Sequence, residues 1–251
     1  MPPRGDVAIV IPARNEADRI GATVQAAARV PGADLIVVVD DGSQDGTAAA
    51  AEQAGALVLR HSRSRGKGAA LETGTEAVRL LERNDDHSER PYLLFLDGDL
   101  AESAGCAGAL VEPVRRGQAD MTIAVFTDRV RAGGHGFVIG LSGAGIRRAT
   151  GWSPAQPLNG QRCLTRAAFE AARPLAAGWG VETGLTIDLL RQGFRVTEVE
   201  VPMAHRATGA DWQAQLHRAR QFAGVARALA VRDPRAQTAR RALDRVTRRE
   251  R

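Results

Sequence analysis

The sequence predicts one large α/β domain with a mostly parallel sheet, helices on both faces of that sheet, and a helical C-terminal appendage. Three observations predict this class. Short apolar runs alternate with longer helical patterns four times before residue 105, which is typical of βαβ units. Each run ends in polar or acidic residues, at the edge where open α/β sheets bind ligands. Finally, 251 residues with 44% hydrophobic content can bury a substantial core.

The N-terminal half is expected to hold four strands. They cover residues 7–11, 35–39, 56–59 and 92–96, each too short for a buried helix. Pro12 is expected to end the first strand, because proline cannot donate to a sheet ladder. Helices are expected from the loop at 12–16 to about residue 29, at 48–54, and from Lys67 to about residue 83.

The C-terminal half has a looser pattern. Helices are expected at 105–116, 137–150 and 181–191, and strands at 121–125, 159–165 and 195–201. From Asp211 the apolar residues keep helical spacing for about five turns, with His and Arg on the other face. We therefore divide the chain into residues 1–125, residues 126–210 as the second half of the same domain, and a C-terminal amphipathic helix with a basic tail at 211–251.

Composition restricts the function classes. Two separated cysteines without a C-x-x-C pattern, and no apolar leader or span, predict a soluble cytoplasmic protein. The net charge of +5 is carried by residues 232–251, where eight Arg face three acidic residues. The remaining body is neutral and only 4% of residues are aromatic, which argues against a nucleic-acid-binding module. Lys67 is the only lysine among 34 basic residues, which suggests a position that needs a compact ammonium.

The motif Asp97-Gly98-Asp99 follows the strand expected at 92–96. Its two carboxylates leave the strand at the edge where ligands bind, and Gly98 lets the backbone turn between them. Both could reach one hard cation that in turn holds a diphosphate. A solvated Asp-Gly turn is the alternative, so the other motifs of the chain must decide between the two interpretations.

The order of four motifs resembles the GT-A family of glycosyltransferases, which has a Rossmann-like sheet. These motifs are Ile11-Pro12-Ala13-Arg14-Asn15-Glu16, the acidic loop at 39–47, Gly66-Lys67-Gly68, and Leu96-Asp97-Gly98-Asp99-Leu100. The resemblance covers residues 7 to about 125 and implies binding of a nucleotide-sugar donor. The donor-binding residues that it implies are Pro12, Ala13, Arg14, Glu16, Asp41, Lys67, Asp97 and Gly98.

Motifs in the second half resemble the family of glucosyl-3-phosphoglycerate synthases. They are Asn159-Gly160-Gln161-Arg162, the stretch at 178–188, and Ala204-His205-Arg206. The resemblance implies a metal site of Asp97, Asp99 and His205, with Mg²⁺ or Mn²⁺ as the cofactor. It also places Glu182 on the acceptor side, where this residue and Asp99 are the implied catalytic groups. Glu182 could accept the proton of the acceptor hydroxyl or orient it.

One departure concerns the acceptor. The glycine-rich turn at 133–136 is followed by Phe137 and Ile139, where the synthase family has an arginine and a threonine that hold the acceptor's phosphate. We therefore expect transfer of a hexose, with UDP-glucose as the model donor, to a small anionic acceptor other than 3-phosphoglycerate. Arg129, Arg131 and His135 are candidates to bind its anionic group.

Two alternatives stay open. The apolar stretch at 137–141 and the basic tail would suit a polyprenyl phosphate presented at a membrane, and the protein could also bind nucleotide sugars without catalysis. A homodimer and peripheral membrane contact through the tail are compatible with the sequence. A receiver domain or a nucleotidyltransferase fits poorly, because Pro12-Ala13-Arg14 follows the first strand instead of an aspartate or a Gly-rich arginine loop.

Overall fold

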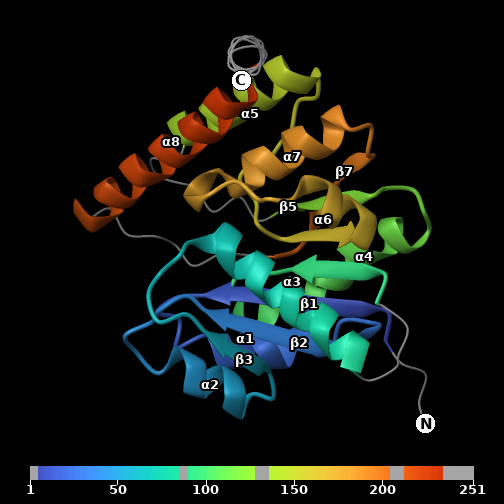
Figure 1. Ribbon diagram of the computed structural model, residues 1–251, viewed down its shortest axis with the longest axis vertical. Helices are drawn as coiled ribbons and strands as arrows, with labels where there is room; N and C mark the ends of the chain where they lie inside the picture. Colours follow the sequence, from blue (N-terminus) through green and yellow to red (C-terminus); the bar gives the residue numbers. More distant parts are fainter. Residues whose placement is uncertain (1–4, 85–89, 128–135, 204–211, 234–251) are drawn as a thin grey trace, which may run out of the picture.

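The computed structural model describes residues 5–84, 90–127, 136–203 and 212–233. Its strands form one seven-stranded sheet in the order β3-β2-β1-β4-β6-β5-β7 (Figure 1). The strands are β1 (Val7–Ala13), β2 (Ala33–Asp40), β3 (Leu57–Arg60), β4 (Tyr92–Phe95), β5 (Met121–Phe126), β6 (Arg162–Thr165) and β7 (Val196–Val201). β6 runs antiparallel to both of its neighbours, whereas the other described pairs are parallel. The predicted mostly parallel sheet is confirmed.

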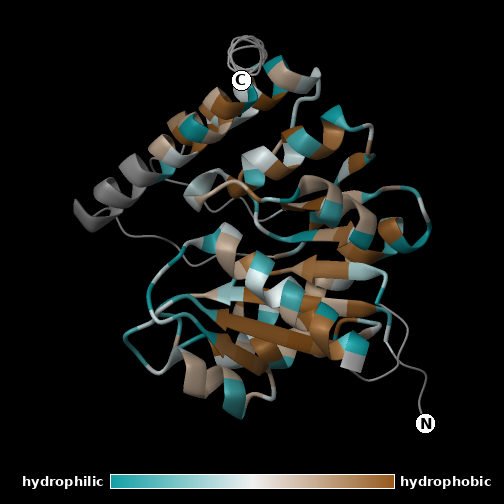
Figure 2. Cartoon of the chain, viewed as in Figure 1, coloured by the Kyte–Doolittle hydropathy of each residue, from teal (hydrophilic) through white to brown (hydrophobic). Residues whose placement is uncertain are grey.

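Helices cover both faces of this sheet. The helical segments are α1 (Ile20–Ala27), α2 (Thr47–Gln53), α3 (Lys67–Asn84), η1 (Ala101–Ala107), α4 (Gly108–Arg115), α5 (Gly136–Thr150), α6 (Arg166–Ala172), η2 (Gly178–Gly180), α7 (Val181–Arg191) and α8 (Trp212–Arg232). Residues Val7, Ile9 and Ile11 point into a core shared with α1, α2, η1 and α4, while Ala8 and Val10 point into a second core with α3, α6 and α7. The central strands are accordingly apolar on both faces (Figure 2).

The C-terminal helix adds a further layer. α8 packs on α5, α7 and η2 at the end of the molecule opposite α2 (Figure 1). An ion pair between the buried Arg232 and the partly buried Asp188 of α7 holds its last turn. Within the described residues, no helix combines the length and the apolarity needed to cross a membrane.

Several predicted boundaries were wrong for identifiable reasons. β1 continues through Pro12 to Ala13. The carbonyl of Val10 accepts from the N–H of Leu96, so the backbone groups of Val10 and of Pro12, two residues further, both face β4. Because β4 ends at Phe95, it offers Pro12 no ladder partner. The missing N–H of Pro12 therefore costs no ladder bond. Helical structure begins at Ala101, several residues before the predicted start. α6 was not predicted, and residues 159–161 form a loop instead of the start of β6.

Candidate active site

The loops that follow β1, β2, β3 and β4 meet at the carboxyl edge of the sheet. Two of them are joined directly. The backbone N–H of Asn15 donates to Ser43 Oγ at 2.9 Å, and its side-chain Oδ1 accepts from the N–H of Gln44 at 2.9 Å. Glu16 is held in the same way, since its N–H donates to Thr47 Oγ1 at 2.8 Å. Pro12, Ala13, Arg14, Glu16 and the acidic loop are thus brought together, as the predicted donor site requires.

The Asp97-Gly98-Asp99 turn follows β4 and packs against the β1 loop. A Cβ on Gly98 would lie 3.1 Å from the Cβ of Ala13, so a larger residue would push the two loops apart. Thr23 of α1 is fully buried beneath this turn. Its hydroxyl donates to the Gly98 carbonyl at 2.9 Å and accepts from the N–H of Ala101 at 2.8 Å. The turn is therefore fixed from below by α1.

Lys67 joins the two halves of the site. Its Nζ lies 2.6 Å from Asp97 Oδ1 and 2.7 Å from Glu182 Oε1, and its side chain is 20% exposed. Burial alone would lower the pKa of this ammonium, but the charges of Asp97 and Glu182 raise it above its usual value. The single lysine of the chain is therefore a permanently charged link between the D-x-D turn and the first turn of α7.

Two residues of the loop before β6 complete this arrangement. Gln161 Nε2 donates to Asp97 Oδ2 at 2.9 Å, while its Oε1 is buried and has no hydrogen-bond partner. A Cβ on Gly160 would lie 2.2 Å from Lys67 Nζ and 2.8 Å from both carboxylate oxygens of Asp97. Glycine is therefore required for the close approach of Lys67 and Asp97.

Arg162 supports Glu182 from within the core. Its guanidinium is 1% exposed, and it donates to the carbonyls of Glu182 at 3.0 Å and of Asn159 at 2.9 Å. It also donates to Thr186 Oγ1 at 2.9 Å. Burial lowers the pKa of Arg162 to about 10, so it stays charged at neutral pH. This cation fixes the start of α7 relative to the loop that carries Gly160 and Gln161.

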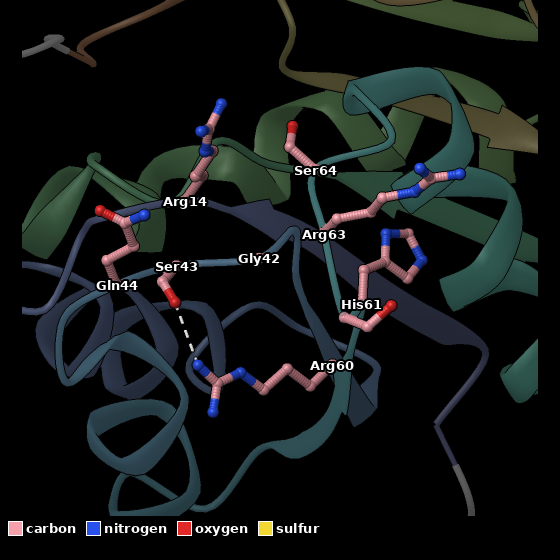
Figure 3. A pocket seen from close by; sticks show the side chains of 9 residues that line it. Arg14, Gly42, Ser43, Gln44, Arg60, His61, Arg63 and Ser64 are labelled. Carbon is pink, nitrogen blue, oxygen red and sulfur yellow. Dashed lines mark hydrogen bonds between the residues drawn. The ribbon is translucent and has the colours of Figure 1, made fainter.

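A pocket with a volume of about 580 Å³ opens beside these loops. Figure 3 shows Arg14 and Gln44 on one side of it, His61 and Arg63 on the other, and Arg60 below. Its lining residues are Arg14, Gly42, Ser43, Gln44, Arg60, His61, Ser62, Arg63 and Ser64. The volume suits a nucleoside, and three arginines make the rim cationic.

Asp41 is used inside the protein. Its Oδ1 accepts from His61 Nδ1 at 2.7 Å and from the N–H of Arg65 at 2.8 Å, and its Oδ2 accepts from Ser64 Oγ at 2.7 Å and from the N–H of Gly66 at 2.8 Å. Four donors occupy the four lone-pair positions of a carboxylate. The predicted contact of Asp41 with a nucleoside stays a prediction, and it would require one of these bonds to open.

The donor chemistry of the site fits a hard cation. Asp97 and Asp99 supply carboxylate oxygens from one turn, and the unpartnered Oε1 of Gln161 is a further oxygen beside them. Cys163 is buried in the core on the α1 face of the sheet and Cys106 packs against that core. Oxygen donors without thiolates suit Mg²⁺ or Mn²⁺. In the part of the chain that the structure describes, no three His, Cys, Asp or Glu side chains form a ready metal group.

Some predicted residues cannot be placed. His205, the third implied metal ligand, and Arg129, Arg131 and His135, the candidates for the acceptor's anionic group, lie outside the described residues. Conversely, Gly160 and Gln161 contact the site although the sequence indicates no role for either residue. A glycine followed by an amide side chain was the available signal. It indicates a site only when the position of the loop is known, because the antiparallel β6 is what brings this loop to the carboxyl edge of β4.

Comparison with known proteins agrees with this geometry. The model of the glycosyl transferase family 2 matches residues 8–153. Glycosyltransferase AglJ of Haloferax volcanii is 34% identical over 215 residues, which are 84% of this chain and 67% of that protein.

Solved structures of glucosyl-3-phosphoglycerate synthase from Mycobacterium tuberculosis are also similar. The complex with phosphoglyceric acid has a TM-score of 0.70 at 26% identity and covers 91% of this chain and 80% of the synthase. The complex with Mn²⁺, UDP-glucose and phosphoglyceric acid has a TM-score of 0.68 at 26% identity and covers 91% and 79%.

Proposed function

The chain belongs to glycosyl transferase family 2, and from this premise we propose that it transfers a hexose from UDP-glucose, or a closely similar donor, to a small anionic acceptor. Family membership makes it a glycosyltransferase and disfavours a non-catalytic binding protein. One observation carries the proposal: a single ammonium, Lys67, contacts both Asp97 of the D-x-D turn and Glu182 of α7. Donor-side and acceptor-side groups thus share one crevice.

The donor would lie along the loops at the carboxyl edge of the sheet. The nucleoside would occupy the pocket between Arg14, Gln44 and Arg63, and the diphosphate would extend toward the D-x-D turn. Arg14, Arg63 and the Lys67 ammonium lie along this path, where their positive charges would attract the anionic donor. The uracil base is favoured over guanine by the similarity to the synthase that binds UDP-glucose.

A divalent cation fits beside the diphosphate. Asp97 and Asp99 would hold it, with His205 as the further ligand implied by the motif resemblance. When bound, the cation supplies Lewis-acid stabilisation of the negative charge that develops on the leaving diphosphate. Lys67 and Gln161 hold the Asp97 carboxylate in place, through Oδ1 and Oδ2 respectively.

Glu182 would act on the acceptor. Its carboxylate is 7% exposed and lies in the first turn of α7, where Lys67 and the carbonyl bond from Arg162 fix its position. It would orient the acceptor hydroxyl or accept its proton. A second acceptor class, a polyprenyl phosphate presented at a membrane, is favoured by one observation: Phe137, at a position where the motif resemblance implies a phosphate-binding residue, is 77% exposed.

The test is calorimetry with UDP-glucose and GDP-mannose, each with and without Mn²⁺. We expect Mn²⁺-dependent binding of the uridine donor, and the change Asp99→Asn should abolish the dependence on Mn²⁺. Asp120→Asn is the matched control, because Asp120 pairs with Arg195 at the opposite end of the sheet. A UDP-release screen of phosphorylated acids and sugars then identifies the acceptor. Absence of metal-dependent binding of either donor would refute the proposal.

A further inference from the structure

Two aromatic rings are exposed on the layer formed by α5 and α8. Phe137 of α5 is 77% exposed and Phe222 of α8 is 38% exposed. Their rings stack with centroids 5.7 Å apart and an interplanar angle of 25°. Contiguous exposed apolar surface, unlike single exposed apolar side chains, marks interaction sites. The stacked pair therefore matters through the apolar surface that adjoins it.

The exposed apolar surface continues along α8. Ala223 and Ala230 are exposed as well. At about 100° per residue, spacings of one and eight residues from Phe222 place both side chains within about 100° of it around the helix. We call the surface made by Phe137, Phe222, Ala223 and Ala230 the α5–α8 face.

The charged residues of α5 and α8 have one sign. Residues 136–150 and 212–232 contain six arginines and no aspartate or glutamate, in a chain that has 29 acidic residues; one of the six, Arg232, is paired with Asp188 of α7. Arg147, Arg148 and Arg227 are exposed. The sequence from 233 to 251 adds a surplus of four positive charges. Apolar side chains on helices whose charged residues are all cations complement a surface with an apolar interior and anionic groups at its boundary.

We propose that the α5–α8 face docks on an anionic membrane surface, with the two phenylalanines inserted between headgroups and the arginines against lipid phosphates. This docking goes beyond the proposed transfer reaction and does not depend on which acceptor is used. It would nevertheless position the acceptor side of the crevice. A Cβ on Gly224 of α8 would lie 3.0 Å from Trp179, and Trp179 precedes Glu182 by three residues.

Co-sedimentation of the full chain with vesicles tests the docking. Vesicles of phosphatidylcholine alone are compared with equimolar phosphatidylcholine and phosphatidylglycerol, at low and at high salt. We expect binding to the anionic vesicles that weakens in high salt. Phe137→Ala removes a largely exposed ring and should lower the partition coefficient about tenfold, as expected for one phenylalanine withdrawn from an apolar environment. Replacing Arg147 and Arg148 together by Gln should weaken binding to the anionic vesicles alone.

Two control variants make equivalent changes at exposed positions outside the α5–α8 face. Leu80→Ala removes another exposed large hydrophobic residue, which is 49% exposed on α3, and Arg116→Gln removes an exposed arginine at the end of α4. Both should bind vesicles like the unmodified chain. An equal loss of vesicle binding in the controls would overturn the proposal, and so would the absence of vesicle binding in the unmodified chain. Binding to RNA alone, or a dimer that Phe137→Ala dissociates without any vesicle binding, would overturn it as well. UDP release measured on the same variants without vesicles reports separately on the transfer reaction.

Discussion

At the scale of single residues, the site depends on how closely three charged groups approach. Lys67 Nζ lies within 2.7 Å of both Asp97 and Glu182, and Gly160 is the residue whose missing side chain makes room for them. The ion pairs are mostly shielded from water, so their geometry matters more than that of surface pairs. Small changes here should alter donor binding and catalysis before they alter the fold.

Replacing Lys67 by arginine keeps the charge but changes its shape. The guanidinium is wider than the ammonium, and the space around Nζ is bounded by Gly160, whose added Cβ would lie only 2.2 Å away. We expect Lys67→Arg to weaken binding of the nucleotide-sugar donor about tenfold, measured by calorimetry. Arg116→Lys, the reverse exchange at an exposed position, should leave donor affinity unchanged. An unaltered affinity in Lys67→Arg would mean that the ammonium has no specific role.

Gly160→Ala tests the same contact from the other side. The added methyl must displace Lys67 or Asp97, because it would lie 2.8 Å from both Asp97 carboxylate oxygens. A displacement of this size should reduce kcat about a hundredfold while thermal unfolding changes little. Gly140→Ala is the control, since a Cβ at Gly140 would meet nothing within 4 Å. Normal turnover by Gly160→Ala would show that the loop can shift without consequence.

At the scale of elements, two polar networks position the loops and helices of the site. Arg162 ties the start of α7 to the loop before β6, and Asp41 ties the end of β2 to the loop before α3. Each network uses a buried charged side chain to hold the backbone of a site loop in place. Because Asp41 accepts its hydrogen bonds as a carboxylate, we expect the order of the loop before α3 to depend on the ionisation of Asp41.

Asp41→Asn should reveal this link through the dependence of stability on pH. Burial alone would raise the pKa of Asp41, but hydrogen bonds from Arg65, His61 and Ser64 hold it below its usual value of 3.8. A carboxyl with a depressed folded-state pKa stabilises the fold above its unfolded-state value, and this contribution is lost as the pH falls through the folded-state pKa. Near neutral pH we therefore expect Asp41→Asn to cost about 1–3 kcal/mol of unfolding free energy.

The measurement is denaturant unfolding of both proteins from neutral pH down to acid. The difference in unfolding free energy between the unmodified chain and Asp41→Asn should shrink once the pH falls below 3.8. Asp45→Asn is a suitable comparison, because Asp45 has a lowered pKa but lies in an exposed part of the acidic loop. A difference that stays constant with pH would indicate that Asp41 acts through shape and not through charge.

At the scale of the whole molecule, the two halves share one sheet. β4 of the first half pairs with β6 of the second, so the sheet continues from β3 to β7 without an edge between them. The core clusters on both faces also combine residues from the two halves. The predicted boundary at residue 125 therefore lies within one folded unit, and we expect the unit to unfold as a whole.

Calorimetric unfolding should show one main transition for residues of both halves. If the donor site is as proposed, UDP with Mn²⁺ at a hundredfold excess over its Kd should stabilise this transition by about 2.7 kcal/mol. Both halves should respond together, because the ligand binds only the assembled crevice. Mn²⁺ alone and UDP alone serve as controls and should shift the transition less. Two separate transitions, with only one responding to UDP, would contradict a shared cooperative unit.

The sequence by itself determined the class of the fold, the direction of most strands and which loops meet at the carboxyl edge of the sheet. Continuous apolar runs such as residues 7–11 and 35–39 can only be buried on both faces, which requires a helix-covered parallel sheet. The order of its motifs also predicted that Asp97, Asp99, Lys67 and the β1 loop meet at one edge. These features are local or depend on strand order, so a linear pattern is enough to reveal them.

The tertiary structure alone decided what joins the two halves. No pattern in the sequence indicates that β6 runs antiparallel beside β4, and this reversal is what brings Gly160 and Gln161 to Asp97. Likewise, only the packing of α7 places Glu182 against Lys67, and only the docking of α8 stacks Phe222 on Phe137. Contacts between residues far apart in sequence depend on distances and packing in three dimensions, which the spacing of residues along a chain does not contain.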